Sequence, residues 1–156
     1  MKSAAEAFKQ ISTKDTIFMS RGDNSGTQAK EKDIWRTAGI NPEGQNFYKQ
    51  TGLGMGQTLS VASEKKAYTL TDRGTYLSLK KNLSLDILVE GDKSLLNIYH
   101  VIEVNPAKFS KVNMHAARAY GEFLLTKEVQ EIIGNFGVDK YKSPLFFPDA
   151  GKPEFE

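Results

Sequence analysis

S-R-G-D-N-S-G-T, residues 20–27, follows the short apolar run of residues 17–19 and precedes a segment of helical pattern, residues 28–37. The sequence therefore predicts a strand that passes directly into the start of a helix. The first backbone N–H groups of a helix have no partner inside it, and they lie at the positive end of the helix dipole. Such a place suits an anion.

This stretch carries further groups that suit an oxyanion. Arg21 offers a rigid fork of N–H donors, Ser25 and Thr27 add hydroxyl donors, and Gly26 lets the backbone approach a ligand closely. Two other interpretations stand beside this one. Ser25 can be an ordinary N-cap within a turn. The tripeptide of residues 21–23, R-G-D, also matches cell-adhesion motifs, but chance often produces so short a match.

The composition excludes several kinds of protein and site. Cysteine is absent, which removes disulfides, zinc–thiolate sites and thiol nucleophiles. His100 and His115 form no H-x-x-x-H pair, so a histidine metal site is not expected. A net charge of +2 on 156 residues makes no electrostatic case for nucleic acid. No apolar run approaches the ~20 residues that span a membrane. Residues 1–8 predict an amphipathic helix start rather than the apolar core of a signal peptide.

Strands and helices are expected to alternate along the chain, which indicates an α/β fold. The predicted helices are residues 3–11, 28–37, 57–64, 71–79, 113–125 and 127–135, and the predicted strands are 16–19, 47–49, 67–70, 86–89 and 96–104. Ser3 and Thr71 are the expected N-caps of their helices, and Trp35 is expected to be a packing residue. Residues 52–56 form a second glycine-rich turn before a helix, with neither the Walker nor the dinucleotide pattern.

No catalytic set assembles from the sequence. The G-x-S-x-G elbow is missing, and neither histidine has the motif support that a serine–histidine–aspartate group needs. Helix starts rich in glycine and hydroxyl residues describe a binder of oxyanions more naturally than a catalyst. Donors of this kind occur at residues 20–27, 55–58 and 70–71. We therefore expect no enzyme activity and no cofactor.

Several ordered runs resemble the periplasmic tungstate-binding proteins of ABC transporters, which are close to molybdate- and phosphate-binding proteins. The resemblance extends over essentially the whole chain, in residues 20–27, 54–59, 62–65, 68–75, 88–92, 136–140 and 144–150. It implies a type II periplasmic-binding fold, in which two α/β lobes hold an oxyanion between them. Residues 1–92 are expected to form the second lobe, and residues 93–156 a crossover strand and C-terminal helices belonging to the first lobe.

The resemblance also implies roles for individual residues. Arg21 pairs with the charge of tungstate or molybdate, while Ser25, Gly26 and Thr27 donate hydrogen bonds to it. Asp23 is expected to orient Arg21 rather than touch the ligand. Residues 55–56 and 71–73 are weaker candidates. The implied partner is the membrane permease of an ABC importer, and no nucleic acid is expected.

The chain departs from the family pattern in two ways. Family members begin with a signal peptide and a first lobe whose T-T-T-S loop donates to the ligand, and neither is visible here. The chain is therefore interpreted as a C-terminal fragment of a periplasmic, or extracellular and lipid-anchored, parent protein. One complete lobe and the returning part of the other are expected, with an exposed apolar surface on the incomplete lobe that favours oligomers.

Two alternatives from other classes stay open. One is a ligand-sensing domain of a regulatory protein with the same lobe architecture, which would need an attached DNA-binding or membrane segment. The other is a small α/β enzyme that handles phosphate, although the chain shows no cluster of metal-binding carboxylates.

Overall fold

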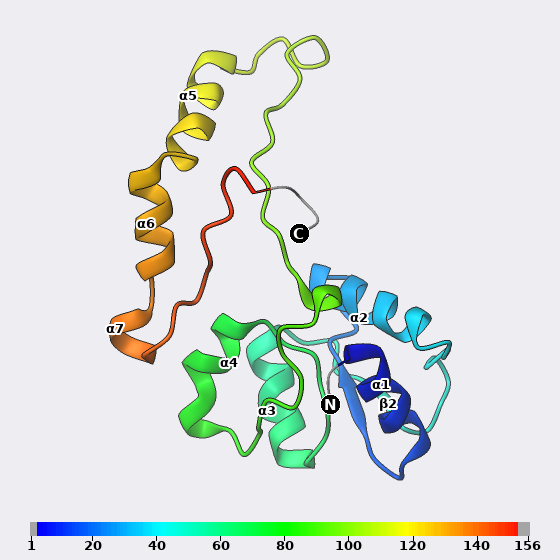
Figure 1. Cartoon of the computed structure of the whole chain (residues 1–156). Helices are drawn as coiled ribbons and strands as arrows, with labels where there is room; N and C mark the ends of the chain where they lie inside the picture. Colours follow the sequence, from blue (N-terminus) through cyan, green and yellow to red (C-terminus); the bar gives the residue numbers. More distant parts are fainter. Residues whose placement is uncertain (1–2, 153–156) are drawn as a thin grey trace. The chain divides into compact units, whose positions relative to one another are not determined.

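The computed structural model describes residues 3–152, so the ends of the two expected lobes, residues 1–2 and 153–156, lie outside the described residues. Contacts group the chain into a first unit up to Asn97 and a second unit from Ile98 onward. Each is described here by itself (Figure 1). The assignment of residues 1–92 and 93–156 to two lobes of one fold stays a prediction.

The first unit is built on a small parallel sheet. β1 (Phe18–Ser20) pairs with β2 (Tyr48–Gln50), with Phe18 opposite Tyr48 and Ser20 opposite Gln50. On the other side of β1, Met19 N donates to Tyr68 O at 2.7 Å, and Phe18 forms an isolated parallel bridge with Tyr68. Three extended segments therefore run in parallel, in the order β2, β1 and the segment around Tyr68.

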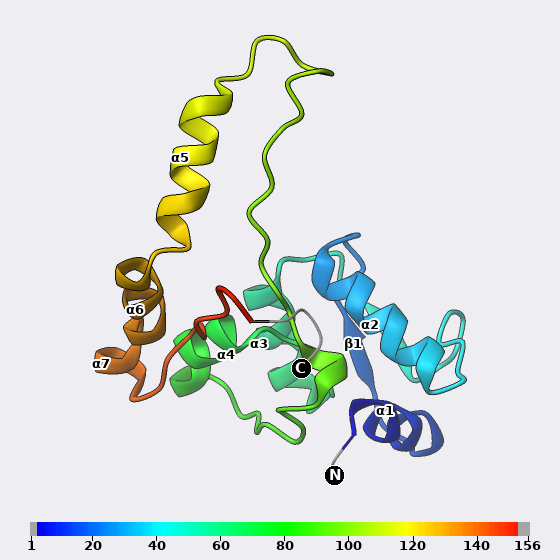
Figure 2. The same ribbon diagram turned by 45° about the horizontal axis from the view of Figure 1, so that its top comes forward.

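Helices connect and cover these segments, in the alternation that the sequence predicts. They are α1 (Ala4–Thr13), α2 (Gly26–Thr37), α3 (Met55–Lys65) and α4 (Arg73–Leu79), followed by the 3₁₀ turns η1 (Lys80–Asn82) and η2 (Lys93–Leu95). Successive side chains of a strand point to opposite faces of a sheet. Accordingly Phe18 packs against apolar side chains of α1 and α2 on one face of the sheet. Met19 packs against α3 residues such as Ala62 on the other face. Figure 2 shows β1 between α2 and α3.

Aromatic side chains form the centre of the first unit. Trp35 is 1% exposed, and its ring centroid lies 4.5 Å from that of Phe8, 5.2 Å from Phe18 and 5.6 Å from Phe47. The prediction of Trp35 as a packing residue is confirmed. The core binds α1, α2 and β1 together, so the position of the α2 N-terminus depends on it.

Of the two N-caps predicted from local sequence, one is confirmed and one is wrong. Ser3 Oγ accepts from Glu6 N at 3.4 Å at the start of α1, as predicted. Thr71 is not the N-cap of α4, contrary to expectation, since Asp72 Oδ1 accepts from Thr75 N at 2.8 Å and Oδ2 from Thr75 Oγ1 at 2.7 Å. A carboxylate that accepts both bonds makes the stronger cap.

Two predicted strands are wrong, including the crossover strand. Residues 86–89 and 96–104 form no strand, and in the latter run Ile102 is 82% and Val104 51% exposed. Apolar alternation favours an extended backbone, but a strand also needs a neighbour that completes its hydrogen-bond ladder. The described residues supply no such neighbour.

Within residues 98–152, the regular secondary structure of the second unit is helical. It contains α5 (Met114–Leu124), α6 (Lys127–Asn135) and α7 (Val138–Tyr141), after the extended run of residues 98–104. Val129 is its one buried large apolar side chain among residues 98–152. Its other large apolar side chains include exposed Tyr120, Phe123, Phe136 and Phe147. The predicted apolar surface is therefore present, and self-association through it stays a prediction.

Candidate functional site

The loop between β1 and α2 carries the predicted site and makes a tight turn. Gly22 has a φ of +64° and Asn24 a φ of +58°, both in the left-handed region that favours glycine and asparagine. A Cβ on Gly22 would lie 2.8 Å from Gln50 Cβ. Glycine is therefore required there by the backbone and by the neighbouring strand. The turn places Arg21 beside the first turn of α2.

Arg21 is held by residues of its own loop. Its Nη2 lies 2.5 Å from Asp23 Oδ2, and its Nη1 donates to Thr27 Oγ1 at 3.4 Å. The side chain is 18% exposed, and its buried Nε has no hydrogen-bond partner among residues 3–152. The expected contact by which Asp23 orients Arg21 is thus observed. Since Asp23 and Thr27 fix the guanidinium of Arg21, the N–H donors of the loop are aligned before an anion binds.

Ser25 connects this ion pair to the helix. Its Oγ accepts from Gln28 N at 3.3 Å, so the interpretation of Ser25 as an N-cap is confirmed. Its backbone N–H donates to Asp23 Oδ1 at 3.2 Å. The Ser25 side chain, followed by its backbone N–H and the Arg21 guanidinium, holds the pKa of Asp23 below its usual value, against the effect of burial. A role for Ser25 in binding a ligand stays a prediction.

The start of α2 leaves backbone donors available. The N–H groups of Gly26 and Thr27 have no hydrogen-bond partner within residues 3–152, as expected for the first residues of a helix. A Cβ on Gly26 would meet no atom within 4 Å. Packing within the described chain therefore does not require glycine at this position, and the backbone there is open to approach.

The second glycine-rich turn lies beside the first. Thr51 N donates to Ser20 O at 3.0 Å and Gly52 N to Arg21 O at 2.8 Å, so the loop after β2 continues along the loop after β1. α3 starts at Met55 without a side-chain cap. Because the strands are parallel, the starts of α2 and α3 lie at the same edge of the sheet, which we call the carboxyl edge.

The side chains of the second turn serve packing rather than binding. Met55 and Thr58 are buried, and Thr58 Oγ1 lies 2.8 Å from Thr51 Oγ1. A Cβ on Gly56 would lie 3.3 Å from Leu79 Cδ1, so this glycine allows α3 to approach α4. The backbone N–H groups at the start of α3 suit a ligand, and a role for residues 55–56 in binding stays a prediction.

The third candidate stretch follows the segment around Tyr68 and also ends at the carboxyl edge. Asp72 caps α4, and the Arg73 guanidinium pairs with Glu90, with Nη1 2.9 Å from Oε2. Thr71 Oγ1 donates to Asp72 O at 3.1 Å. All three predicted donor stretches thus lie at one edge of the sheet, in the order of their strands. Arg21, Ser25, Gly26 and Thr27 form one local cluster within them.

A buried acid lies behind this cluster. Glu31 on α2 is 2% exposed, and Tyr48 Oη lies 2.7 Å from its Oε1. Burial raises the pKa of Glu31 above its ordinary value of 4.5, opposed mainly by the hydrogen bond from Tyr48. The pKa of Tyr48 is raised to about 12, first by burial. Glu31 does not stand out in the sequence, because its position there is typical of one of several charges on a solvated helix face.

Protonation of Glu31 predicts a definite dependence of stability on pH. The folded state binds this proton more tightly than the unfolded state, so the free energy of unfolding falls as pH rises from 4.5 through the raised folded pKa. Glu31→Gln removes this contribution. We expect the stability difference between wild type and Glu31→Gln to favour wild type more at the acidic end of that window. Urea denaturation at a series of pH values measures it, and a difference that is constant with pH would contradict it.

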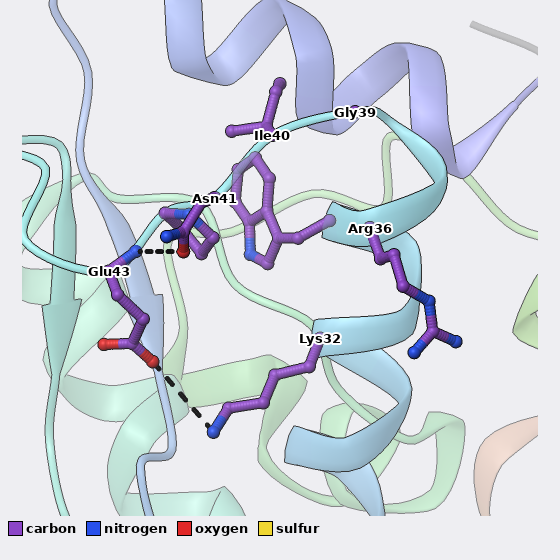
Figure 3. A pocket seen from close by; sticks show the side chains of 8 residues that line it. Lys32, Arg36, Gly39, Ile40, Asn41 and Glu43 are labelled. Carbon is purple, nitrogen blue, oxygen red and sulfur yellow. Dashed lines mark hydrogen bonds and ion pairs between the residues drawn. The ribbon is translucent and has the colours of Figure 1, made fainter.

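A shallow pocket of about 450 Å³ lies elsewhere on the first unit (Figure 3). It is formed by the last turns of α2 and the loop after it, with lining residues Lys32, Trp35, Arg36, Gly39, Ile40, Asn41, Pro42 and Glu43. Lys32 Nζ and Glu43 Oε1 are 4.0 Å apart across it. The pocket is at the end of α2 opposite to the predicted site and contains none of its residues.

Residues 3–152 contain neither a helix that could span a membrane nor a cluster of metal-binding side chains. No helix in this part of the chain combines the length and apolar character needed to cross a membrane. The same residues contain no group of three or more histidine, cysteine, aspartate or glutamate side chains that could hold a metal ion.

The chain is similar to known binding proteins. It is 49% identical over 146 residues to the tungstate-binding protein TupA of Peptoclostridium acidaminophilum, covering 94% of this chain and 51% of that protein. It is 47% identical over 155 residues to a putative ABC transporter anion-binding protein of Haloferax volcanii, covering 96% of this chain and 44% of the relative. The chain thus spans about half the length of these relatives.

A solved structure of a tungstate-binding protein is also similar to this chain. The tungstate-binding protein TupA from Desulfovibrio alaskensis G20 superposes with a TM-score of 0.80 at 41% identity, over 95% of this chain and 60% of that one. The mixed strands and helices of the first unit, with parallel pairing, match the predicted α/β, type II periplasmic-binding-like class. The family model described as PBP superfamily domain matches residues 2–128. On this evidence the chain belongs to the PBP superfamily and is a homologue of the tungstate-binding proteins TupA.

Proposed function

We propose that the chain binds a tetrahedral oxyanion, tungstate or molybdate, for delivery to an ABC importer, and that it is not an enzyme. The observation that carries the proposal is the local cluster at the start of α2, where the Arg21 guanidinium lies beside two free backbone N–H groups. Such an arrangement binds a dehydrated anion through fixed donors. The names of the relatives, a tungstate-binding protein and an anion-binding protein of an ABC transporter, support the same ligand class.

The proposed ligand-binding residues are Arg21, Ser25, Gly26 and Thr27. Arg21 supplies the charge and the N–H fork, positioned by Asp23. Gly26 and Thr27 supply backbone N–H groups, and Thr27 and Ser25 add hydroxyl groups. The site needs no metal or other cofactor for this task. The proposed partner is the permease of the importer, and the proposed location is outside the cytoplasmic membrane, in the periplasm or its equivalent.

Isothermal titration calorimetry of the 156-residue chain tests the ligand class. Tungstate and molybdate are titrated in parallel with sulfate and phosphate, at the same ionic strength, because surface electrostatics depend on salt. We expect heat for at least tungstate or molybdate, with saturation at one site. Absence of binding for all four anions would contradict the proposal for this chain.

Replacing Gly26 with alanine separates stability from binding. We expect the free energy of unfolding to rise by about 0.4–1 kcal/mol, because alanine restricts the unfolded chain and its Cβ meets open space. Tungstate affinity should fall about tenfold, because the added methyl group occupies the open space where the anion approaches the backbone and weakens a hydrogen bond to a charged group. Denaturation and calorimetry on the same preparation measure the two effects.

The matched control is Gly74→Ala, in the first turn of α4, where a Cβ would make only an ordinary contact at 3.4 Å with Asp72 Oδ1. It should leave tungstate affinity unchanged. If Gly26→Ala raises stability and binds tungstate as wild type does, the backbone of Gly26 does not contact the ligand.

A further inference from the structure

Glu31 is a buried acid on the same helix as the proposed oxyanion site. It follows Gly26 by five residues, which at 1.5 Å per residue places it about 7.5 Å farther along the axis of α2. It is only 2% exposed. An acid that is buried this close to an anion site interacts with the anion through protein rather than through water, so the interaction is weakly screened.

A hydrogen bond ties the carboxyl group of Glu31 to β2, one of the two strands that support the site. Tyr48, at the start of β2, has its Oη 2.7 Å from Glu31 Oε1. β2 pairs with β1, whose last residue, Ser20, is fully buried and precedes Arg21. The carboxyl group therefore contacts the small sheet whose end carries Arg21.

No cation neutralises Glu31 directly. It forms no salt bridge within residues 3–152. The groups that influence it are the Tyr48 phenol from β2, the Ser20 hydroxyl from β1, and the Trp35 indole and Lys32 ammonium from α2 itself. Lys32 is 51% exposed and reaches toward Glu43, which acts on Tyr48 in turn. α1 contributes the apolar side chains of Ala4, Phe8 and Ile11 to this core.

We propose that Glu31 is a proton-linked positioning residue, which takes up one proton from solvent when the oxyanion binds at the start of α2. The inference rests on the proposed function. An ionised Glu31 repels a dianion and a neutral Glu31 does not, so each equilibrium shifts the other by the same factor. Glu31 does not touch the ligand. It sets the electrostatic potential behind the site and thereby the affinity.

Calorimetric titration with tungstate tests the proposal from neutral pH downward, toward the ordinary glutamate pKa of 4.5, over the range in which tungstate stays a dianion. Runs in two buffers of different ionisation enthalpy count the protons taken up. For wild type we expect affinity to increase as pH falls, by at most about tenfold per pH unit for one linked proton. The Glu31→Gln variant should bind tungstate with an affinity that does not depend on pH. Its binding should be accompanied by no proton uptake. Glu64→Gln, an exposed glutamate on α3, is the matched control and should keep the wild-type profile.

Two further measurements test the same role of Glu31, and the first does not require the Glu31→Gln variant. Tyr48→Phe removes a hydrogen bond that favours the ionised carboxylate, so the pH profile of binding should move to higher pH. The chain contains one tryptophan, Trp35, which is buried one helical turn after Glu31 on α2. Its fluorescence should therefore titrate with Glu31 in the free protein, and this transition should be lost in Glu31→Gln.

The outcomes separate this inference from the proposed function. Wild type that binds tungstate with no proton uptake and no dependence on pH overturns the role of Glu31 and leaves the oxyanion site standing. The same holds if Glu31→Gln keeps the wild-type pH profile. If wild type binds none of the oxyanions at any pH, both proposals fall together.

Discussion

Replacing Arg21 with alanine is expected to weaken tungstate binding by about 1.5–3 kcal/mol, the range for hydrogen bonds to charged groups, which corresponds to about a 10- to 150-fold loss of affinity. Arg21 is the one side chain of the proposed cluster that carries a positive charge, and Asp23 and Thr27 already hold its guanidinium in place. Its removal deletes charge and directed donors together. Calorimetric titration of the variant with tungstate measures the effect.

The control for Arg21→Ala is Arg36→Ala on the same helix. Arg36 is 80% exposed, pairs with Asp33 at 2.9 Å and lines the shallow pocket of Figure 3. Its replacement should change tungstate affinity little, because exposed ion pairs contribute little and the pocket is at the other end of α2. Wild-type affinity in Arg21→Ala would place Arg21 outside the site. A large loss in Arg36→Ala instead would place the ligand in the pocket.

The second large effect concerns stability. Trp35→Ala is expected to lower the free energy of unfolding by about 3–5 kcal/mol, the range for truncation of a buried large aromatic residue. Trp35 is 1% exposed and contacts Phe8, Phe18 and Phe47. The cavity left behind would separate α1 from α2. Urea denaturation followed by far-ultraviolet circular dichroism measures the loss, since fluorescence is removed with the only tryptophan.

Tyr120→Ala is the control for truncation of an aromatic side chain. Tyr120 lies on α5 and is 62% exposed, so its replacement should change stability by no more than about 0.5 kcal/mol. A loss below about 1 kcal/mol for Trp35→Ala would contradict the aromatic core around it, because it lies well below the range for truncation of a buried tryptophan.

Prediction from sequence succeeded where the cause is local. The run of residues 17–27 predicts a strand, a turn and a helix start, and the structure has β1, the loop and α2 there. Ser25 caps the helix that begins with the next residue, and Asp23 lies two residues from the arginine that it holds. Each of these contacts spans a few residues, so local geometry brings the partners together without help from the rest of the chain.

Prediction failed where pairing with another segment or competition with a neighbouring residue decides. Residues 86–89 and 96–104 have the apolar pattern of strands, but no neighbouring strand pairs with them in the described structure. Thr71 has the right residue type for a cap, and the adjacent Asp72 makes the bonds instead. A pattern states what a segment can form, whereas pairing and competition between neighbours decide what it does form.

The sequence by itself determined the α/β alternation, the turn before α2 and the cluster of Arg21, Ser25, Gly26 and Thr27, because these depend on propensities and contacts within a few residues. Only the tertiary structure decided that the loops after β1 and β2 lie side by side and that Glu31 is buried against Tyr48, 17 residues away. A charged residue on a polar helix reads as solvated until packing removes its water. Burial and long-range hydrogen bonds depend on how the elements pack together. Packing therefore decides that an acid is buried behind the proposed anion site.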